Sequence, residues 1–139
     1  MTTVRRDSYL VRKRAKLVQP EREVMEATEV EQNAKRQALV RNVNEDISAI
    51  DRRFGGSVEL RIICECGRAD CAKLVAVPRE LYDTVRREAT QFVVLPGHER
   101  MDVERVIACG PHGEFLLVRN IGRAAEIARA TNPRLGAEG

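Results

Sequence analysis

The chain has 139 residues, enough for one folded domain, and its 24 basic and 21 acidic side chains leave a net charge of +3, too small to indicate a nucleic-acid partner. Aromatic residues make up only 4% and tryptophan is absent, which disfavours a platform that stacks single-stranded bases. No apolar run is long enough for a membrane span or a signal peptide, so we expect a cytoplasmic protein.

Charge is concentrated in the first part of the sequence. Residues 1–20 hold six basic side chains against Asp7 alone, and residues 21–34 hold five glutamates against Arg22. A basic arm before an acidic stretch suits a nucleic acid or an acidic protein, and the same composition is typical of a solvated tail. We expect residues 1–20 to be a flexible arm. Its candidate nucleic-acid-binding residues are Arg5, Arg6, Arg12, Lys13, Arg14 and Lys16.

A long amphipathic helix is predicted over residues 21–55, because this stretch contains no proline and no glycine before its last position. Pro20 suits the start of such a helix, whereas Thr28 and Glu31 fit a capping box that would start the helix later. The glycines at 55–56 tolerate the left-handed conformation that ends a helix.

Apolar residues within this helix recur at spacings of 3, 4, 3 and 4, which is the pattern of a helical seam. The seam consists of Val40, Val43, Ile47, Ile50 and Phe54. A seam of this length is short for a free-standing coiled coil, so we expect it to pack on the domain that follows. The alternative is that it packs on its copy, which would make the protein a weak homodimer instead of a monomer.

The period of the apolar pattern changes after the helix and predicts a small mixed α+β domain over residues 56–132, followed by a tail at 133–139. The predicted strands are 58–64, 74–77, 92–95, 103–109 and 114–119, and the predicted helices start at Pro78 and span 124–130. The last two strands flank a Gly-Pro-His-Gly loop and should form a hairpin. The fold class is therefore α+β, with a long N-terminal helix ahead of a small domain that carries a Cys3His-type metal knuckle.

Three of the four cysteines, Cys64, Cys66 and Cys71, fall close together in the sequence. In a reducing compartment, such a cluster is more typical of a metal or redox site than of disulfides. Zinc prefers thiolates, with some imidazole, in closed tetrahedral sites. Gly67 follows the second cysteine and allows the backbone to turn its amides toward a sulfur, as in a metal knuckle. We therefore predict Zn2+ as the cofactor.

The fourth zinc ligand has three candidates, which are His98, Cys109 and His112. His98 lies in a Pro-Gly-His-Glu turn that fixes where its side chain points, and we predict it as the ligand. Cys109 and His112 lie at the predicted hairpin loop and remain alternatives. A lone cysteine at a strand end is most often a small hydrophobic residue.

Several stretches resemble a group of small actinobacterial proteins with no established activity. They are Cys64-Glu-Cys-Gly…Cys71, Glu80-Leu-Tyr82…Val85-Arg86, Phe92-Val-Val-Leu-Pro-Gly-His98-Glu99 and Glu104-Arg105-Val106. The resemblance covers residues 36–132 and excludes the basic arm. The group's pattern has no equivalent of Cys109 and His112, which implies His98 as the fourth ligand.

The expected function is a zinc-stabilised, non-catalytic binding or regulatory module whose partner is another protein. An enzyme is not expected, because four protein ligands leave zinc no open position and two histidines offer few general bases. Two alternatives stay open. One is a nucleic-acid-binding accessory protein that acts through the basic arm, and the other is a thiol redox sensor with a zinc-thiolate switch.

Overall fold

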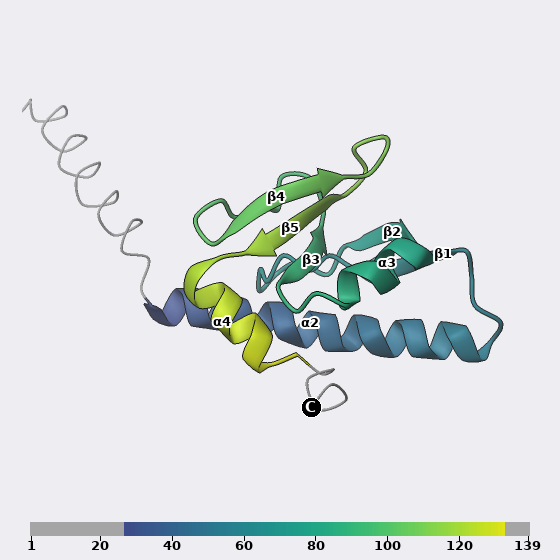
Figure 1. Ribbon diagram of the computed structural model, residues 1–139, viewed down its shortest axis with the longest axis horizontal. Coiled ribbons are helices and arrows are strands. Elements are labelled where there is room, and N and C mark those ends of the chain that lie inside the picture. Colours follow the sequence, from purple (N-terminus) through teal and green to yellow (C-terminus); the bar gives the residue numbers. More distant parts are fainter. Residues whose placement is uncertain (1–26, 133–139) are drawn as a thin grey trace, which may run out of the picture. The chain divides into compact units, whose positions relative to one another are not determined.

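The structure is a computed structural model, in which residues 27–132 are described. Its elements are α2 (Ala27–Arg53), β1 (Glu59–Ile63), β2 (Leu74–Pro78), α3 (Arg79–Arg86), β3 (Gln91–Val94), β4 (Glu104–Cys109), β5 (Leu116–Asn120) and α4 (Gly122–Ala130) (Figure 1). This order matches the predicted order, and the α+β class with a long N-terminal helix is confirmed. The predicted arm at 1–20, the helix residues before 27 and the tail at 133–139 lie outside the described residues.

From Glu31 onward, the described residues form one compact unit that contains two small antiparallel sheets. In the first sheet, β1 pairs with β2, which places Leu60 opposite Val77 and Ile62 opposite Val75. All four of these side chains are buried, because alternate residues of a strand share one face. The second sheet has the order β3-β5-β4, and β4 and β5 form the predicted hairpin.

One hydrophobic core joins both sheets to α3 and α4. Its members without solvent exposure are Ile62, Val77, Tyr82, Phe92, Val93, Val94 and Val118. Two of the predicted metal ligands, Cys64 and Cys66, belong to the same buried cluster. The predicted metal site therefore borders the core of the domain.

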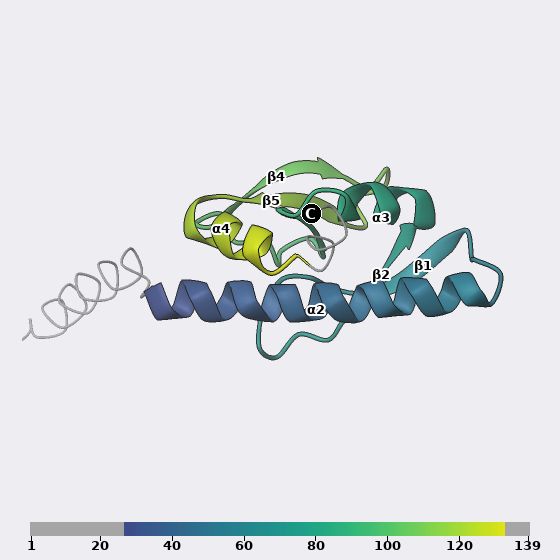
Figure 2. The same ribbon diagram turned by 60° about the horizontal axis from the view of Figure 1, so that its bottom comes forward.

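The inward face of α2 is polar. Its buried residues are Asn33, Ala34, Gln37, Ala38, Arg41, Asn44 and Ser48. The five polar ones recur at spacings of 4, 4, 3 and 4, which places them on one side of a helix. Figure 2 shows α2 running beside the sheets and α4. Hydrogen bonds of its polar side chains connect it to β1, β5 and α4.

Arg41 shows how this polar packing works. Its guanidinium donates hydrogen bonds to the carbonyls of Ala89, at 2.9 Å, and Ala128, at 3.3 Å, and to the hydroxyl of Thr131, at 3.2 Å. It also lies 5.3 Å from the ring centroid of Phe92, where a cation is favoured. Burial lowers its pKa to about 10, which leaves the side chain charged at neutral pH.

The expectation that the apolar seam of α2 packs on the domain is wrong. Val43, Ile50 and Phe54 are 43%, 52% and 84% exposed, and Val40 and Ile47 are half-buried. The physical reason lies in the surface that α2 covers, which presents backbone carbonyls, amides and a buried carboxylate. Polar side chains satisfy these groups, whereas apolar ones would leave them buried without partners.

Candidate metal centre

The first part of the site is the loop between β1 and β2. Cys64 follows the last residue of β1, and its amide donates to the carbonyl of Lys73 at 2.8 Å, which closes the base of the loop. Gly67 has a φ of +80°, a conformation that side-chain-bearing residues rarely adopt. A Cβ on Gly67 would also lie 2.7 Å from the backbone oxygen of Asn33 on α2. Glycine is therefore required here both by the turn and by the close approach of the helix.

The second part of the site is the turn after β3 that carries His98. The amide of His98 donates to the carbonyl of Leu95 at 2.9 Å, and Gly97 has a φ of +90°. The guanidinium of Arg68, in the cysteine loop, donates to the carbonyl of Gly97 at 3.0 Å. The loop and the turn are thus connected by a direct hydrogen bond.

Cys64, Cys66, Cys71 and His98 come together, and one ligand atom from each lies within 4.8 Å of all the others. His98 Nδ1 is 3.7 Å from Cys64 Sγ and 3.6 Å from Cys71 Sγ. A tetrahedral zinc site with bonds of about 2.3 Å to sulfur and about 2.05 Å to nitrogen has a sulfur-to-nitrogen edge of about 3.6 Å. The two distances from His98 Nδ1 therefore match the edges of a Cys3His metal site, with Nδ1 as the candidate imidazole ligand atom.

Backbone amides stabilise negative charge on the sulfurs. The amide of Leu95 donates to Cys64 Sγ at 3.2 Å. A hydrogen bond from Cys64 lowers the pKa of Cys66, and a hydrogen bond from the amide of Arg68 lowers it further. The same pairing with Cys66, followed by burial, raises the pKa of Cys64. One thiolate thus forms readily, and a bound cation would favour loss of the remaining thiol protons.

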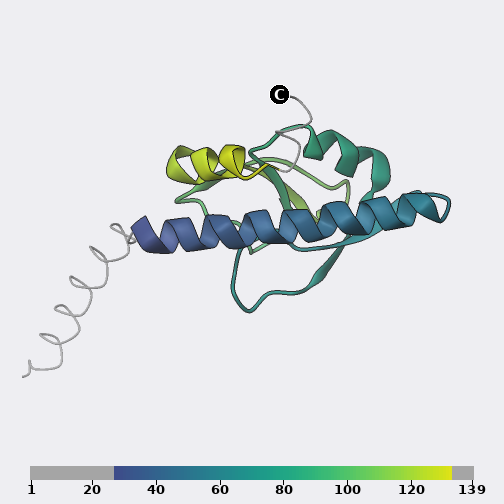
Figure 3. The same cartoon turned by 90° about the horizontal axis from the view of Figure 1, so that it is seen from below.

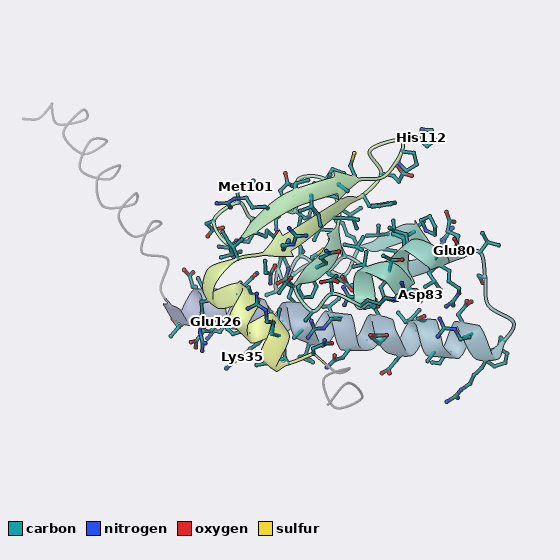
Figure 4. All side chains as sticks on the ribbon, in the orientation of Figure 1. Lys35, Glu80, Asp83, Met101, His112 and Glu126 are labelled. Atoms are coloured by element: carbon teal, nitrogen blue, oxygen red, sulfur yellow. The ribbon has the colours of Figure 1, made fainter. Side chains whose placement is uncertain are left out.

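The two alternative ligands lie elsewhere. Cys109 is the last residue of β4 and is exposed, and His112 is exposed in the loop between β4 and β5. Figure 4 places His112 at the outer tip of this loop, away from α2. Within residues 27–132, no second group of three or more potential metal ligands is found. His98 is therefore the fourth member of the cluster.

The polar face of α2 holds the backbone of the cysteine loop, a role that the sequence interpretation missed. Asn44 exchanges two hydrogen bonds of 2.9 Å with the backbone of Ile63. Gln37 donates to the carbonyl of Glu65 at 3.0 Å, and Arg36 donates to the carbonyl of Gly67 at 2.7 Å. The helix therefore fixes the backbone on both sides of Cys64 and Cys66.

Glu65 lies between Cys64 and Cys66 in the sequence, and its side chain is fully buried. Its carboxylate accepts hydrogen bonds from Asn44 Nδ2 at 2.8 Å and from the amide of Val93 at 2.9 Å, and it pairs with Arg86 at 3.2 Å. One residue thus connects the cysteine loop to α2, α3 and β3.

The polar face of α2 was visible in the sequence as a polar stripe with helical spacing. The apolar seam beside it had the stronger conventional interpretation, because buried helix faces are usually apolar.

The six basic residues of the arm lie outside the described residues. None of the described helices combines the length and the apolar character needed to cross a membrane. Comparisons with protein-family models, with curated proteins and with solved structures found no match to this chain. A functional assignment therefore depends on the chemistry of the site itself.

Proposed function

We propose that this protein is a zinc-stabilised, non-catalytic binding or regulatory module that acts on another protein in a reducing, cytoplasmic setting. The observation that supports the proposal is the Cys3His cluster, whose sulfur-to-nitrogen distances of 3.6 and 3.7 Å match a tetrahedral zinc site. All four cysteines of the chain are free, which suits a reducing compartment.

The number of candidate ligands supports a non-catalytic role. Four protein ligands complete the zinc shell, whereas catalytic zinc sites keep one position for water or substrate. Cys64 and Cys66 are buried in the hydrophobic core cluster, which also limits access to the metal. Zinc in this position would stabilise the fold by connecting the β1–β2 loop to the turn after β3.

The experiment that tests this proposal is metal analysis of the full chain purified without added metal. We expect one zinc ion per chain, and we expect the His98→Ala variant to lose it. His112→Ala is the matched control, because it removes the same side chain from an exposed loop, and it should retain zinc. A well-folded chain that contains little zinc, or equal retention by both variants, would contradict the proposal.

A thiol redox sensor is the second candidate, because three thiol sulfurs lie within 4.8 Å of one another. In that case peroxide would oxidise two cluster thiolates to a disulfide and release zinc, and a thiol reductant would restore binding. We expect the closed shell to retain zinc under mild peroxide. Reversible release within minutes would favour the sensor.

The nucleic-acid-binding accessory role is the third candidate, and it is motivated only by the charge of the arm. Binding through six basic residues would depend steeply on salt and would disappear when residues 1–18 are deleted. We expect weak binding of duplex DNA or RNA at physiological salt. Tight binding that is lost with the arm would support this candidate over a protein partner.

A further inference from the structure

Two stripes of opposite character run along α2. The polar stripe, which includes Asn44 and Ser48, is buried against the chain's own domain. The apolar stripe consists of Leu39, Val40, Val43, Ile47 and Ile50 on a different side of the helix, and of Phe54, which directly follows the last helical residue. Four of these residues are exposed, namely Leu39 at 62%, Val43 at 43%, Ile50 at 52% and Phe54 at 84%.

The apolar stripe is continuous in the described part of the chain, and its four exposed residues are interspersed with the half-buried Val40 and Ile47. Positions 43, 47, 50 and 54 fall on successive turns, so their side chains form one strip and not isolated surface residues. In Figure 3, no described element crosses in front of α2. An exposed apolar strip on a helix that is polar on its buried side is typical of an interaction surface.

We propose that this stripe is a homodimer interface, in which α2 packs antiparallel against α2 of a second copy of the chain. The heptad spacing defines the pairing, because core positions of one helix face complementary core positions of the other. In one register, Ile47 packs against the partner's Ile50, and Val43 packs against the partner's Phe54. The two-fold axis then passes between the two helices, level with positions 48 and 49, and both contacts occur twice.

The charged residues beside the apolar stripe favour a second copy of the chain as its binding partner. In the same register, Asp46 of each chain lies beside the partner's Arg53, which gives two symmetric opposite-charge pairs. Asp46 and Arg53 are both exposed, and within residues 27–132 neither forms an ion pair. A parallel arrangement would instead place Asp46 near the partner's Asp51 and repel it. The surface of α2 is thus complementary to itself in the antiparallel orientation.

The short apolar stripe can associate because α2 is already ordered before the dimer forms. A free helix of this length would have to order its backbone on binding, at a large entropic cost. Here the polar stripe has already fixed α2 on its own domain, as the contacts of Asn44 and Arg41 show. Only side chains on the apolar stripe lose freedom when the dimer forms. The inference goes beyond the proposed metal-stabilised module and does not depend on which ion the cluster binds.

The first test uses the full chain in sedimentation equilibrium over a wide dilution series. We expect a concentration-dependent dimer for the wild type and a monomer for Ile50→Glu, with unchanged far-UV circular dichroism because this side chain is half exposed. Leu74→Glu is the matched control, since Leu74 is 57% exposed but lies on β2, outside the stripe. This control should still dimerise. A wild type that stays monomeric, or an Ile50→Glu variant that still dimerises, would overturn the proposal.

The second test checks the antiparallel register by exchanging charges. Asp46→Arg and Arg53→Asp each turn two attractive contacts into repulsive ones, and each should weaken dimerisation about tenfold. The double variant restores opposite charges across the interface, so its affinity should return to near the wild-type value. Failure of the double variant to recover would overturn the antiparallel pairing. Binding of another protein by a chain that remains monomeric would identify a different occupant of the stripe.

Discussion

The carboxylate of Glu65 and the guanidinium of Arg86 form an ion pair of 3.2 Å in which neither side chain is exposed to solvent. Arg86 also lies 5.3 Å from the ring centroid of Tyr82 and 5.4 Å from that of Phe92. The aromatic faces and the carboxylate together stabilise a cation that has lost its water. Because Glu65 lies between two cysteines of the cluster, the core and the candidate metal centre are structurally coupled.

Glu65→Gln should destabilise the protein by about 3–5 kcal/mol, because it leaves the Arg86 charge buried without a counter-charge. The measurement is the free energy of unfolding in urea with zinc present throughout. Asp83→Asn is a suitable control, since its partner Arg52 is 58% exposed and such surface pairs contribute about 0–1 kcal/mol. Equal losses in both variants would contradict the assigned role of the buried pair.

Gly67→Ala should destabilise the protein more than Gly97→Ala. Both glycines have positive φ, at +80° and +90°, so both substitutions cause backbone strain of about 1–3 kcal/mol. Only at Gly67 would the new methyl group meet the backbone of Asn33, at 2.7 Å, whereas nothing lies within 4 Å at Gly97. The melting temperatures of the two variants separate the steric clash with Asn33, which occurs only at Gly67, from the backbone strain that both variants share. Similar melting temperatures would show that α2 moves aside easily.

Because of Glu104, the free energy of unfolding should fall as the pH rises from about 4.5 to about 7. Burial raises its pKa from 4.5 to about 7, so over this range the folded state holds a proton that the unfolded state has released. The stabilisation is complete below pH 4.5 and is lost as pH rises through 7. As the pH rises from 4.5 to 8, the free energy of unfolding of Glu104→Gln should therefore increase by up to about 3 kcal/mol relative to that of the wild type. The measurement is the difference in unfolding free energy at each pH, and a constant difference would contradict the prediction.

Chelation of a metal held by the Cys3His cluster should expose backbone amides at the site to exchange before those of the β3-β5-β4 sheet. The amide of Leu95 donates to Cys64 Sγ and should lose hydrogen-exchange protection when a chelator removes the metal. Amides in the β4–β5 hairpin, which pair backbone to backbone, should retain more of theirs. Exchange measured by NMR with and without chelator compares the two regions. Equal loss in both would indicate global unfolding, and no change at Leu95 would contradict metal binding by Cys64.

The local elements and the four residues that cluster could be predicted from the sequence because their signals are short-range. Glycines end α2 and shape both turns, alternation marks β1, and the spacing of three cysteines indicates a knuckle. His98 was favoured among three candidates because a Pro-Gly turn restricts its direction. Each of these inferences concerns residues that constrain their own immediate backbone.

The orientation of α2 was decided by tertiary structure alone. Its sequence contains an apolar stripe and a polar stripe, and hydrophobicity alone favours burial of the apolar one. The domain instead presents the carbonyl of Glu65 and the amide of Ile63 to the helix, and these buried polar groups require hydrogen-bonding partners. Gln37 and Asn44 supply them, so the polar stripe faces inward and the apolar stripe outward. Both stripes can be recognised in the sequence of α2, but the groups that select which of them faces inward come from residues far away in the chain.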